Sequence, residues 1–492
     1  MSLIQRLFLC QPHDRVRAGQ GPALRRCLGV WGLIAVGLGT MLGGIFTTIG
    51  IGTLAAGPGV IVSFLLSGLA CFFVSLCYAE LSSMVPIAGS AYTYAYATLG
   101  EVVAWIIGWD LLLEYGISVA PVAASWSGYV QTILLNFGVK VPEWAQVAHL
   151  QVAGGRIDLA HSQVDLLAAG VVLTLAVLLA IGIKESSSTN SFLVIIQVVA
   201  IVVFVVGLAS AIHPTNFHPV FPKGLHGVVS GAALVFFAYI GFDTVTVASE
   251  EARRPERDVP FAVVGSLAIG AVLYIAIAWV TVGVVPWEHI NKDAGMGDAV
   301  IRAGNNPWLA GIVFVGAIAG TTTVMLTSLL GQIRIFYVMA RDRMLPPFVS
   351  RVNARTKTPV LTTLVTGGII AILAGAVPLD VLLALVNIGT LSAFTIVCAG
   401  VLALRWTRPD AARPFRAPFA PLVAVLGAVL CLGMMIGGLS GATWIRFVVW
   451  FVAGMAVYAF YGFRTSLLRG GNGELAWRRQ PSPALPENER TR

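Results

Sequence analysis

The chain is a succession of long apolar stretches separated by short polar segments. An α-helix rises 1.5 Å per residue, so about 20 mainly apolar residues cross a hydrocarbon core of roughly 30 Å. This pattern predicts twelve membrane-spanning helices, and the fold class is therefore an all-α integral membrane protein. The predicted spans are 31–52, 59–84, 100–136, 164–183, 191–212, 227–250, 259–284, 307–340, 359–377, 379–404, 419–440 and 443–463.

Composition and charge support this reading. The 492 residues are 57% hydrophobic and 11% charged, and the mean hydropathy is +0.85, too apolar for a soluble protein of this length. With the N-terminus inside, 25 of the 31 Lys and Arg residues lie on the cytoplasmic side, where such residues collect. We therefore expect a multi-pass protein of the inner (cytoplasmic) membrane with both termini cytoplasmic and no cleavable signal peptide.

The spans divide the chain into five parts. We expect a cytoplasmic N-terminal arm (1–30), a first repeat (31–212), a second repeat (227–405), two further helices (419–463) and a disordered cytoplasmic tail (464–492). The net charge of +8 follows from orientation in the membrane, so no nucleic-acid partner is indicated. The six cysteines lack CxxC spacing, and we expect no metal site and no cofactor.

The first span is unusually rich in glycine. The stretch "VGLGTMLGGIFTTIGIG" (36–52) holds six glycines, although glycine costs about 1 kcal/mol relative to alanine inside a helix. Two explanations are open: close packing against a neighbouring helix, or a break in the helix that faces a polar cavity. The sixth span also has an interior glycine, Gly241, followed by Asp243. These two spans each open a run of five, the arrangement of an inverted repeat, and we predict that both are interrupted.

Two interrupted helices favour a particular ligand class. The free amides at a half-helix N-terminus bind a carboxylate, and freed carbonyl groups bind an ammonium group. An amino acid carries both groups. The pattern therefore predicts an amino acid site near the middle of the membrane, at the meeting point of the two breaks.

Five long motifs resemble those of a known family: "GLGTMLGGIF" (37–46), "CYAELSSMVPIAGSAYTYAYATLGE" (77–101), "IGWDLLLEYG" (107–116), "FFAYIGFDTVTVASEEARRPERDVP" (236–260) and "GQIRIFYVMARDRMLP" (331–346). They resemble the bacterial cationic-amino-acid-transporter group of the amino acid–polyamine–organocation superfamily. The resemblance implies a leucine-transporter-type five-plus-five inverted repeat with broken helices 1 and 6. It implies a secondary transporter that moves L-amino acids by alternating access.

The resemblance also assigns site residues. It implies that the substrate carboxylate is bound at Gly39, Thr40, Met41, Leu42, Gly43 and Gly44. It implies that the substrate amine is bound, and the pocket gated, at Phe237, Ala238 and Ile240. Relatives usually have Gly-x-Gly before Ile-Phe, whereas this chain has two adjacent glycines, so the loop is one residue shorter.

Ionisable residues inside a membrane cost about 2.5–3.5 kcal/mol and are functional candidates by default. Glu114 and Asp243 are assigned to the side-chain pocket or to proton handling, together with Met325 as a filler of side-chain space. Asp110 shares a helix face with Glu114 and is expected to satisfy freed backbone amides. The two carboxyl groups suit either a proton or a cationic side chain, so cationic and neutral amino acids both stay open.

The coupling ion is open as well. In many bacterial relatives the fifth helix carries a lysine at the ion site, and here Gln197 matches it. Glutamine cannot titrate, so three routes remain: proton coupling through Glu114 or Asp243, sodium binding, or exchange and facilitated diffusion. For sodium, the candidate ligands are helix-1 carbonyls and the hydroxyls of Thr321, Thr322 and Thr323.

Cytoplasmic gating is expected between the second and third spans. There Tyr92, Tyr94 and Tyr96 alternate, and we predict a short interfacial element with its aromatic rings at headgroup level. Gate salt bridges are predicted among Glu80, Glu250, Glu251, Arg253 and Arg254.

Other function classes lack a signature. A channel would need a charged or carbonyl-lined filter, a sensor would need a soluble output domain, and an enzyme would need a nucleophile–base set or metal ligands. None of the seven histidines falls in a predicted span. We expect a transporter and no enzyme, with an amino acid, the bilayer and protons as partners.

Overall fold

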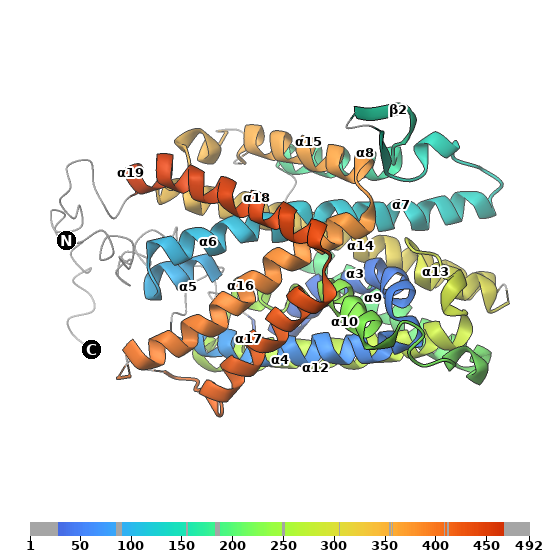
Figure 1. The fold of residues 1–492 in the computed structure, drawn as a ribbon, viewed down its shortest axis with the longest axis horizontal. Coiled ribbons are helices and arrows are strands. Elements are labelled where there is room, and N and C mark those ends of the chain that lie inside the picture. The colour runs from blue at the N-terminus through green and yellow to red at the C-terminus, as the bar shows by residue number, and fades with distance from the viewer. Residues whose placement is uncertain are drawn as a thin grey trace.

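The computed structural model describes residues 28–466, apart from 85–90, 154–155, 183–186, 248–250, 305, 354–355, 357, 408 and 411–412. Almost all of the predicted N-terminal arm and C-terminal tail lies outside this range. The helices run mostly along the long axis of the molecule, with α16 and α17 inclined to it (Figure 1).

Every predicted span overlaps a helix or a pair of consecutive helices. Their bounds are α3 Val30–Ala56, α4 Val60–Met84, α6 Glu101–Leu112 with α7 Val119–Asn136, α8 Leu166–Ile181, α9 Ser187–Leu208, α10 Gly224–Val235 with α11 Thr244–Val247, α12 Pro255–Val284, α14 Pro307–Arg341, α15 Val360–Ala376, α16 Leu379–Thr407, α17 Ala420–Gly438 and α18 Gly441–Val457.

Nine helical segments of the described chain are long and apolar enough to cross a membrane, and the first, Val30–Met84, contains both α3 and α4. The helices Leu166–Ile181 and Val360–Ala376 are apolar but shorter. The protein is therefore a multi-pass α-helical membrane protein, whereas the number of twelve crossings stays a prediction.

Local sequence explains several helix ends. Asp165 precedes α8 and its carboxylate accepts a hydrogen bond from the amide of Ala168. Asn306 precedes α14 and accepts bonds from the amides of Trp308 and Leu309. Such caps satisfy amides that have no partner within the helix. Gly182 ends α8 in the left-handed conformation that favours glycine.

The predicted break in the first helix is wrong for this structure. α3 is one continuous α-helix over 27 residues. A side-chain carbon at Gly43 would lie 2.5 Å from the carbonyl oxygen of Gly320 in α14, and one at Gly44 would lie 2.9 Å from the Cα of Ala238. The glycines thus allow the backbones of neighbouring helices to pack closely. The continuous helix also provides hydrogen-bond partners for its own amides, which lipid does not offer.

The predicted break in the sixth helix is confirmed. α10 ends at Val235, a 3₁₀ turn follows at Phe236–Tyr239, and Ile240 is extended. Gly241 has φ of +120°, a backbone conformation that other residues adopt only with strain. α11 resumes at Thr244. The sixth span therefore changes direction at the carboxylate-bearing segment.

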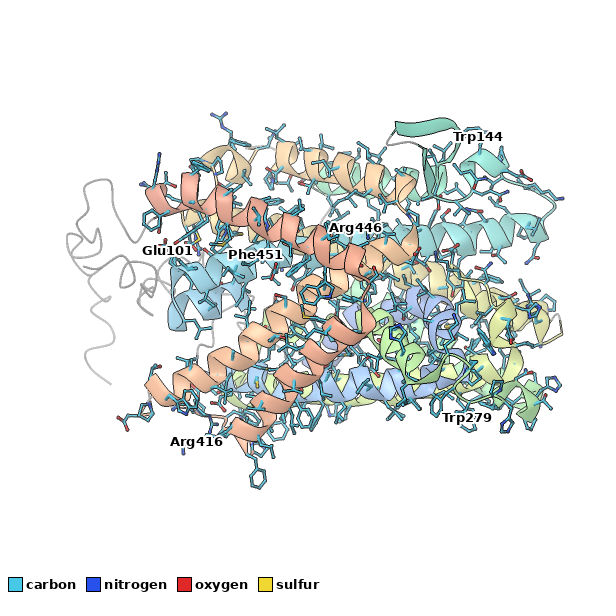
Figure 2. All side chains as sticks on the ribbon, in the orientation of Figure 1. Glu101, Trp144, Trp279, Arg416, Arg446 and Phe451 are labelled. Atoms are coloured by element: carbon cyan, nitrogen blue, oxygen red, sulfur yellow. The ribbon has the colours of Figure 1, made fainter. Side chains whose placement is uncertain are left out.

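Three elements lie outside the spans. An antiparallel hairpin, β1 His149–Ala153 and β2 Arg156–Gln163, lies between α7 and α8, so the all-α prediction omitted a small β-element. Helix α5 (Ala91–Thr98) precedes α6, and α13 (Gly295–Arg302) precedes α14. Figure 2 shows Glu101, at the start of α6, and Trp144, near the hairpin, at opposite ends of the molecule.

Candidate functional site

A cavity lies where α3, the helix-6 break, α14 and the junction of α6 and α7 meet. The free space between its lining atoms amounts to ≈ 460 Å³, open solvent included. Its lining residues are Thr40, Gly44, Glu114, Tyr115, Ser118, Phe237, Ile240, Gly241, Asp243, Thr244, Val324, Thr327 and Ser328.

Hydroxyl groups connect α3 to the helix-6 break. The Thr40 hydroxyl lies 2.9 Å from the carbonyl oxygen of Gly241 and 2.9 Å from the hydroxyl of Thr244. A side-chain carbon at Gly241 would lie 2.8 Å from the Thr40 hydroxyl oxygen. The break is therefore held directly against α3, and only glycine leaves room for this approach.

Tyr274 of α12 makes a second connection between these elements. Its hydroxyl lies 2.7 Å from the carbonyl oxygen of Met41 and 2.7 Å from that of Ala238. Tyr274 is fully buried. It therefore connects the backbone of α3 to that of the helix-6 break.

Two carboxyl groups line the cavity. Glu114 and Asp243 are 2% and 3% exposed, and neither Glu114 oxygen nor Oδ1 of Asp243 has a hydrogen-bond partner within the described parts of the chain. Oδ2 of Asp243 accepts a hydrogen bond of 3.3 Å from the Tyr115 hydroxyl. Glu114 lies in a π-helical turn, Leu113–Ile117, a distortion often found at functional sites. No basic side chain is among the lining residues.

The cavity collects six of the predicted site residues: Thr40, Gly44, Glu114, Phe237, Ile240 and Asp243. The others pack elsewhere. A side-chain carbon at Gly39 would meet Val194 of α9. Met41, Leu42, Ala238 and Met325 are completely buried and are not among the lining residues.

The predicted ion site is a separate buried region. Gln197 is 0% exposed and neither atom of its amide has a partner; its Cγ lies close to Gly320. The hydroxyls of Thr321 and Thr323 donate to the carbonyls of Ala317 and Ala319, four residues earlier in their own helix. Thr322 is half-buried. A role of these residues in ion binding stays a prediction.

Sequence reasoning missed several lining residues: Tyr115, Ser118, Thr244, Val324, Thr327 and Ser328. A signal was available for Ser118, which follows Glu114 by four residues and so shares its helix face. Thr327 and Ser328 carry no such signal, because threonine and serine are common in membrane helices and usually bond to their own backbone. Thr327 does so with the carbonyl of Thr323.

The short element predicted between the second and third spans is helix α5, which precedes α6. Tyr92 and Tyr96 are each 1% exposed, so their rings are buried within the protein, and their depth at headgroup level stays a prediction; the side chain of Tyr94 lies outside the described residues. The Tyr92 hydroxyl donates to Asp342 over 2.9 Å. Burial raises the pKa of Asp342 to about 6, against the opposing charge of Arg341.

Glu80 is buried on the same side with different partners from those predicted. Its carboxylate accepts hydrogen bonds from Arg405 at 2.6 and 3.1 Å and from the amide of Ala417 at 2.9 Å. Arg413 lies 3.4 Å away. Glu250, which was predicted to take part in the same set of gate salt bridges, lies outside the described residues. Glu80 thus joins α4 to the end of α16 and to the segment that precedes α17.

At the opposite end, the segment before α13 covers α3 and α7. A side-chain carbon at Gly50 would lie 2.6 Å from the carbonyl oxygen of Lys292. The Ser125 hydroxyl donates to the carbonyl of Asp293 over 2.9 Å, and Lys292 pairs with Asp380 at 2.5 Å. Burial raises the pKa of Asp293.

A broken membrane helix beside a cavity that is lined by apolar side chains, hydroxyl groups and two buried carboxyl groups is the arrangement expected of a multi-pass membrane transport protein. The family model described as amino acid permease matches residues 28–466. The chain belongs to this family, within the amino acid–polyamine–organocation superfamily, and it is a transporter and not an enzyme.

Named relatives cover almost the whole chain. It is 40% identical to a branched-chain amino acid permease of Bacillus subtilis over 458 residues, 93% of this chain and 97% of the relative. It is 40% identical to a methylthioribose transporter of the same species over 465 residues, 94% and 99% of the two chains. It is 37% identical to mouse cationic amino acid transporter 4 over 412 residues, 81% of this chain and 63% of the relative.

Proposed function

We propose that the protein carries a neutral, branched-chain L-amino acid across the inner membrane together with a proton. The mechanism is alternating access in a twelve-helix, five-plus-five repeat whose termini are both cytoplasmic. The observation that carries this proposal is the lining of the cavity: the apolar side chains of Phe237, Ile240 and Val324 stand beside the carboxyl groups of Glu114 and Asp243, of which only Oδ2 of Asp243 has a hydrogen-bond partner among the described residues. A branched aliphatic side chain fits the first set, and a proton fits the second.

The amino and carboxylate groups of the substrate are assigned to the two glycine-containing segments. The amino group binds carbonyl groups of the helix-6 break at Phe237, Ala238 and Ile240. The Ala238 carbonyl already accepts from Tyr274, and a carbonyl oxygen can accept two hydrogen bonds. The carboxylate is assigned to the segment Gly39–Gly44 of α3, of which Thr40 and Gly44 line the cavity.

Coupling is assigned to Glu114 and Asp243. Both are buried at the cavity without a basic partner, and burial favours the uncharged carboxyl form. Sodium is the alternative: Thr321 and Thr323 donate their hydroxyl hydrogens within their own helix, which leaves the lone pairs of their oxygens for a cation. Gln197 has no titratable group, so it is assigned a structural role in the region of the predicted ion site.

A thiosugar such as methylthioribose is a second candidate substrate. Five serine and threonine residues, Thr40, Ser118, Thr244, Thr327 and Ser328, line the cavity, and together with the carboxyl groups they can bind sugar hydroxyls. A relative of similar length carries that name.

Uptake of tritiated L-isoleucine into proteoliposomes tests the proposal. We expect accumulation when the outside is more acidic, competition by leucine and valine, and no competition by the corresponding oxo acid, which lacks the amine. Stronger competition by arginine or by methylthioribose would reassign the substrate. Equal uptake with and without the pH gradient would refute proton coupling. Glu114→Gln and Asp243→Asn should impair driven uptake in folded protein.

A further inference from the structure

Asp110 is a third carboxyl group buried in the membrane, and it does not line the cavity. It is 1% exposed, and neither of its oxygens has a hydrogen-bond partner among the described residues. Asp110 therefore does not satisfy freed backbone amides, as the sequence suggested. An unpartnered ionisable group at this depth is costly and is by default a functional candidate.

The position of Asp110 relative to Glu114 is the first argument. Asp110 lies in the last turn of α6 and Glu114 in the π-helical turn that follows. Side chains four residues apart share a helix face, with Cβ atoms about 5–6 Å apart. A single water molecule can span the two carboxyl groups at that separation. Glu114 lines the cavity, so Asp110 lies one turn from it, toward the start of α6.

The surroundings of the pair are the second argument. Thr390 of α16 lies near Glu114 and Ser392 lies near Asp110, although neither hydroxyl completes a hydrogen bond to the carboxyl group. The other titratable groups that face Glu114 and its neighbour Tyr115 are Asp243 and the phenol of Tyr78. No described basic group is among them. A row of polar groups thus continues from the cavity along the interface of α6 and α16.

The third argument is what lies beyond Asp110. A side-chain carbon at Gly108 would lie 2.8 Å from the ring of Tyr92 and 3.1 Å from the sulfur of Met339. Tyr92 belongs to α5 and is bonded to Asp342. α5 therefore packs on the turn of α6 that holds Asp110, and with the proposed topology movement of α5 would uncover this turn toward the cytoplasm.

We propose that Asp110 is the inner station of a proton path, which takes the proton from Glu114 and releases it to the cytoplasm when α5 moves. The inference rests on the proposed proton coupling. In the first step the O–H bond of Glu114 breaks as one forms on the Asp110 carboxylate, and the negative charge moves from Asp110 to Glu114. In the second step Asp110 gives the proton to a cytoplasmic water molecule and becomes a carboxylate again.

The test compares exchange with driven transport in proteoliposomes that contain the full chain. For Asp110→Asn we expect counterflow of tritiated L-isoleucine within twofold of the unsubstituted protein, because exchange needs no proton release. Accumulation driven by a pH gradient should fall tenfold or more, and substrate-dependent acidification of the lumen, followed with a trapped pH dye, should disappear. Glu143→Gln, which removes an exposed carboxyl group, should leave all three readouts unchanged.

Asp110→Glu keeps an ionisable group, so it should show driven accumulation with a shifted pH profile. This variant also tests the inference if Asp110→Asn does not fold. An equal loss of counterflow and driven uptake in both variants would assign Asp110 a structural role and overturn the inference. Unchanged driven uptake in Asp110→Asn would also overturn it. Absence of a pH-driven component in the unsubstituted protein would instead refute the proposed coupling itself.

Discussion

Gly43 provides a direct test of the closely packed, continuous first helix. In the structure a side-chain carbon at Gly43 would collide with Val324 and would lie 2.5 Å from the backbone oxygen of Gly320. Carbon–oxygen contacts of this kind normally lie at about 3.3 Å or more. Gly43→Ala therefore requires α3 and α14 to separate by roughly 0.8 Å, since a backbone oxygen cannot rotate away as a side chain can.

The expected energy follows from two opposing effects. Overpacking costs about 1–3 kcal/mol, and the rigid contact places Gly43→Ala near the upper end. Replacing glycine by alanine inside a helix returns about 1 kcal/mol. The net loss is about 2 kcal/mol, which lowers Tm by about 2–4 °C in a protein of this size.

The assay is thermal unfolding in detergent, followed by size-exclusion chromatography of the soluble fraction. Gly170→Ala is the matched control, because Gly170 lies in the apolar helix α8 with no atom within 4 Å of an added carbon; its Tm should stay the same or rise. A Gly43→Ala protein as stable as Gly170→Ala would show that α3 and α14 do not pack closely at this point.

Three further predictions concern charged and polar groups. Because burial raises the pKa of Asp342 to about 6, the unfolded chain ionises first and the native state loses stability as pH rises from about 4 to 6. Asp342→Asn removes this loss. The unfolding free energy of the variant minus that of the unsubstituted protein should therefore increase by up to about 3 kcal/mol from pH 4 to pH 7.5. A difference that does not change with pH would contradict the prediction. Glu80→Gln leaves two arginines without their carboxylate and should cost roughly 3–5 kcal/mol, more than Arg405→Gln, whose side chain is 27% exposed. Gln197→Ala should leave the pH dependence of isoleucine uptake between pH 5 and 8 intact, and its selective loss would place the coupling site at Gln197.

Much of the fold could be predicted from the sequence because lipid imposes one simple requirement. A spanning helix must be apolar over about 20 residues, and this pattern located each helix to within a few residues. The break of the sixth helix was also predictable, since the interior Gly241 is followed two residues later by the carboxylate of Asp243. The hairpin at His149–Gln163 was not, because it lies outside the spans where lipid sets no pattern.

The site was only partly predictable. Glu114 and Asp243 were found because a carboxyl group in a membrane segment is rare and conspicuous. The same rule identified Asp110 but could not say what it contacts. Glycine in the first helix was ambiguous, since a break and a close contact demand the same residue, and only the neighbouring backbone of Gly320 distinguishes them.

The close contact of α3 with α14 bears on how the helices could move. Thr40 and Tyr274 tie α3 to the helix-6 break, so α3, the break and α12 should move as one body. Alternating access, as proposed, then requires this body to shift against α14, where Gly43 faces the backbone of Gly320 and the side chain of Val324. Glycine places no side chain in this contact, whereas the methyl group of alanine would press on both groups of α14. Gly43 would therefore serve the motion as well as the packing, and Gly43→Ala should slow transport at temperatures well below its Tm.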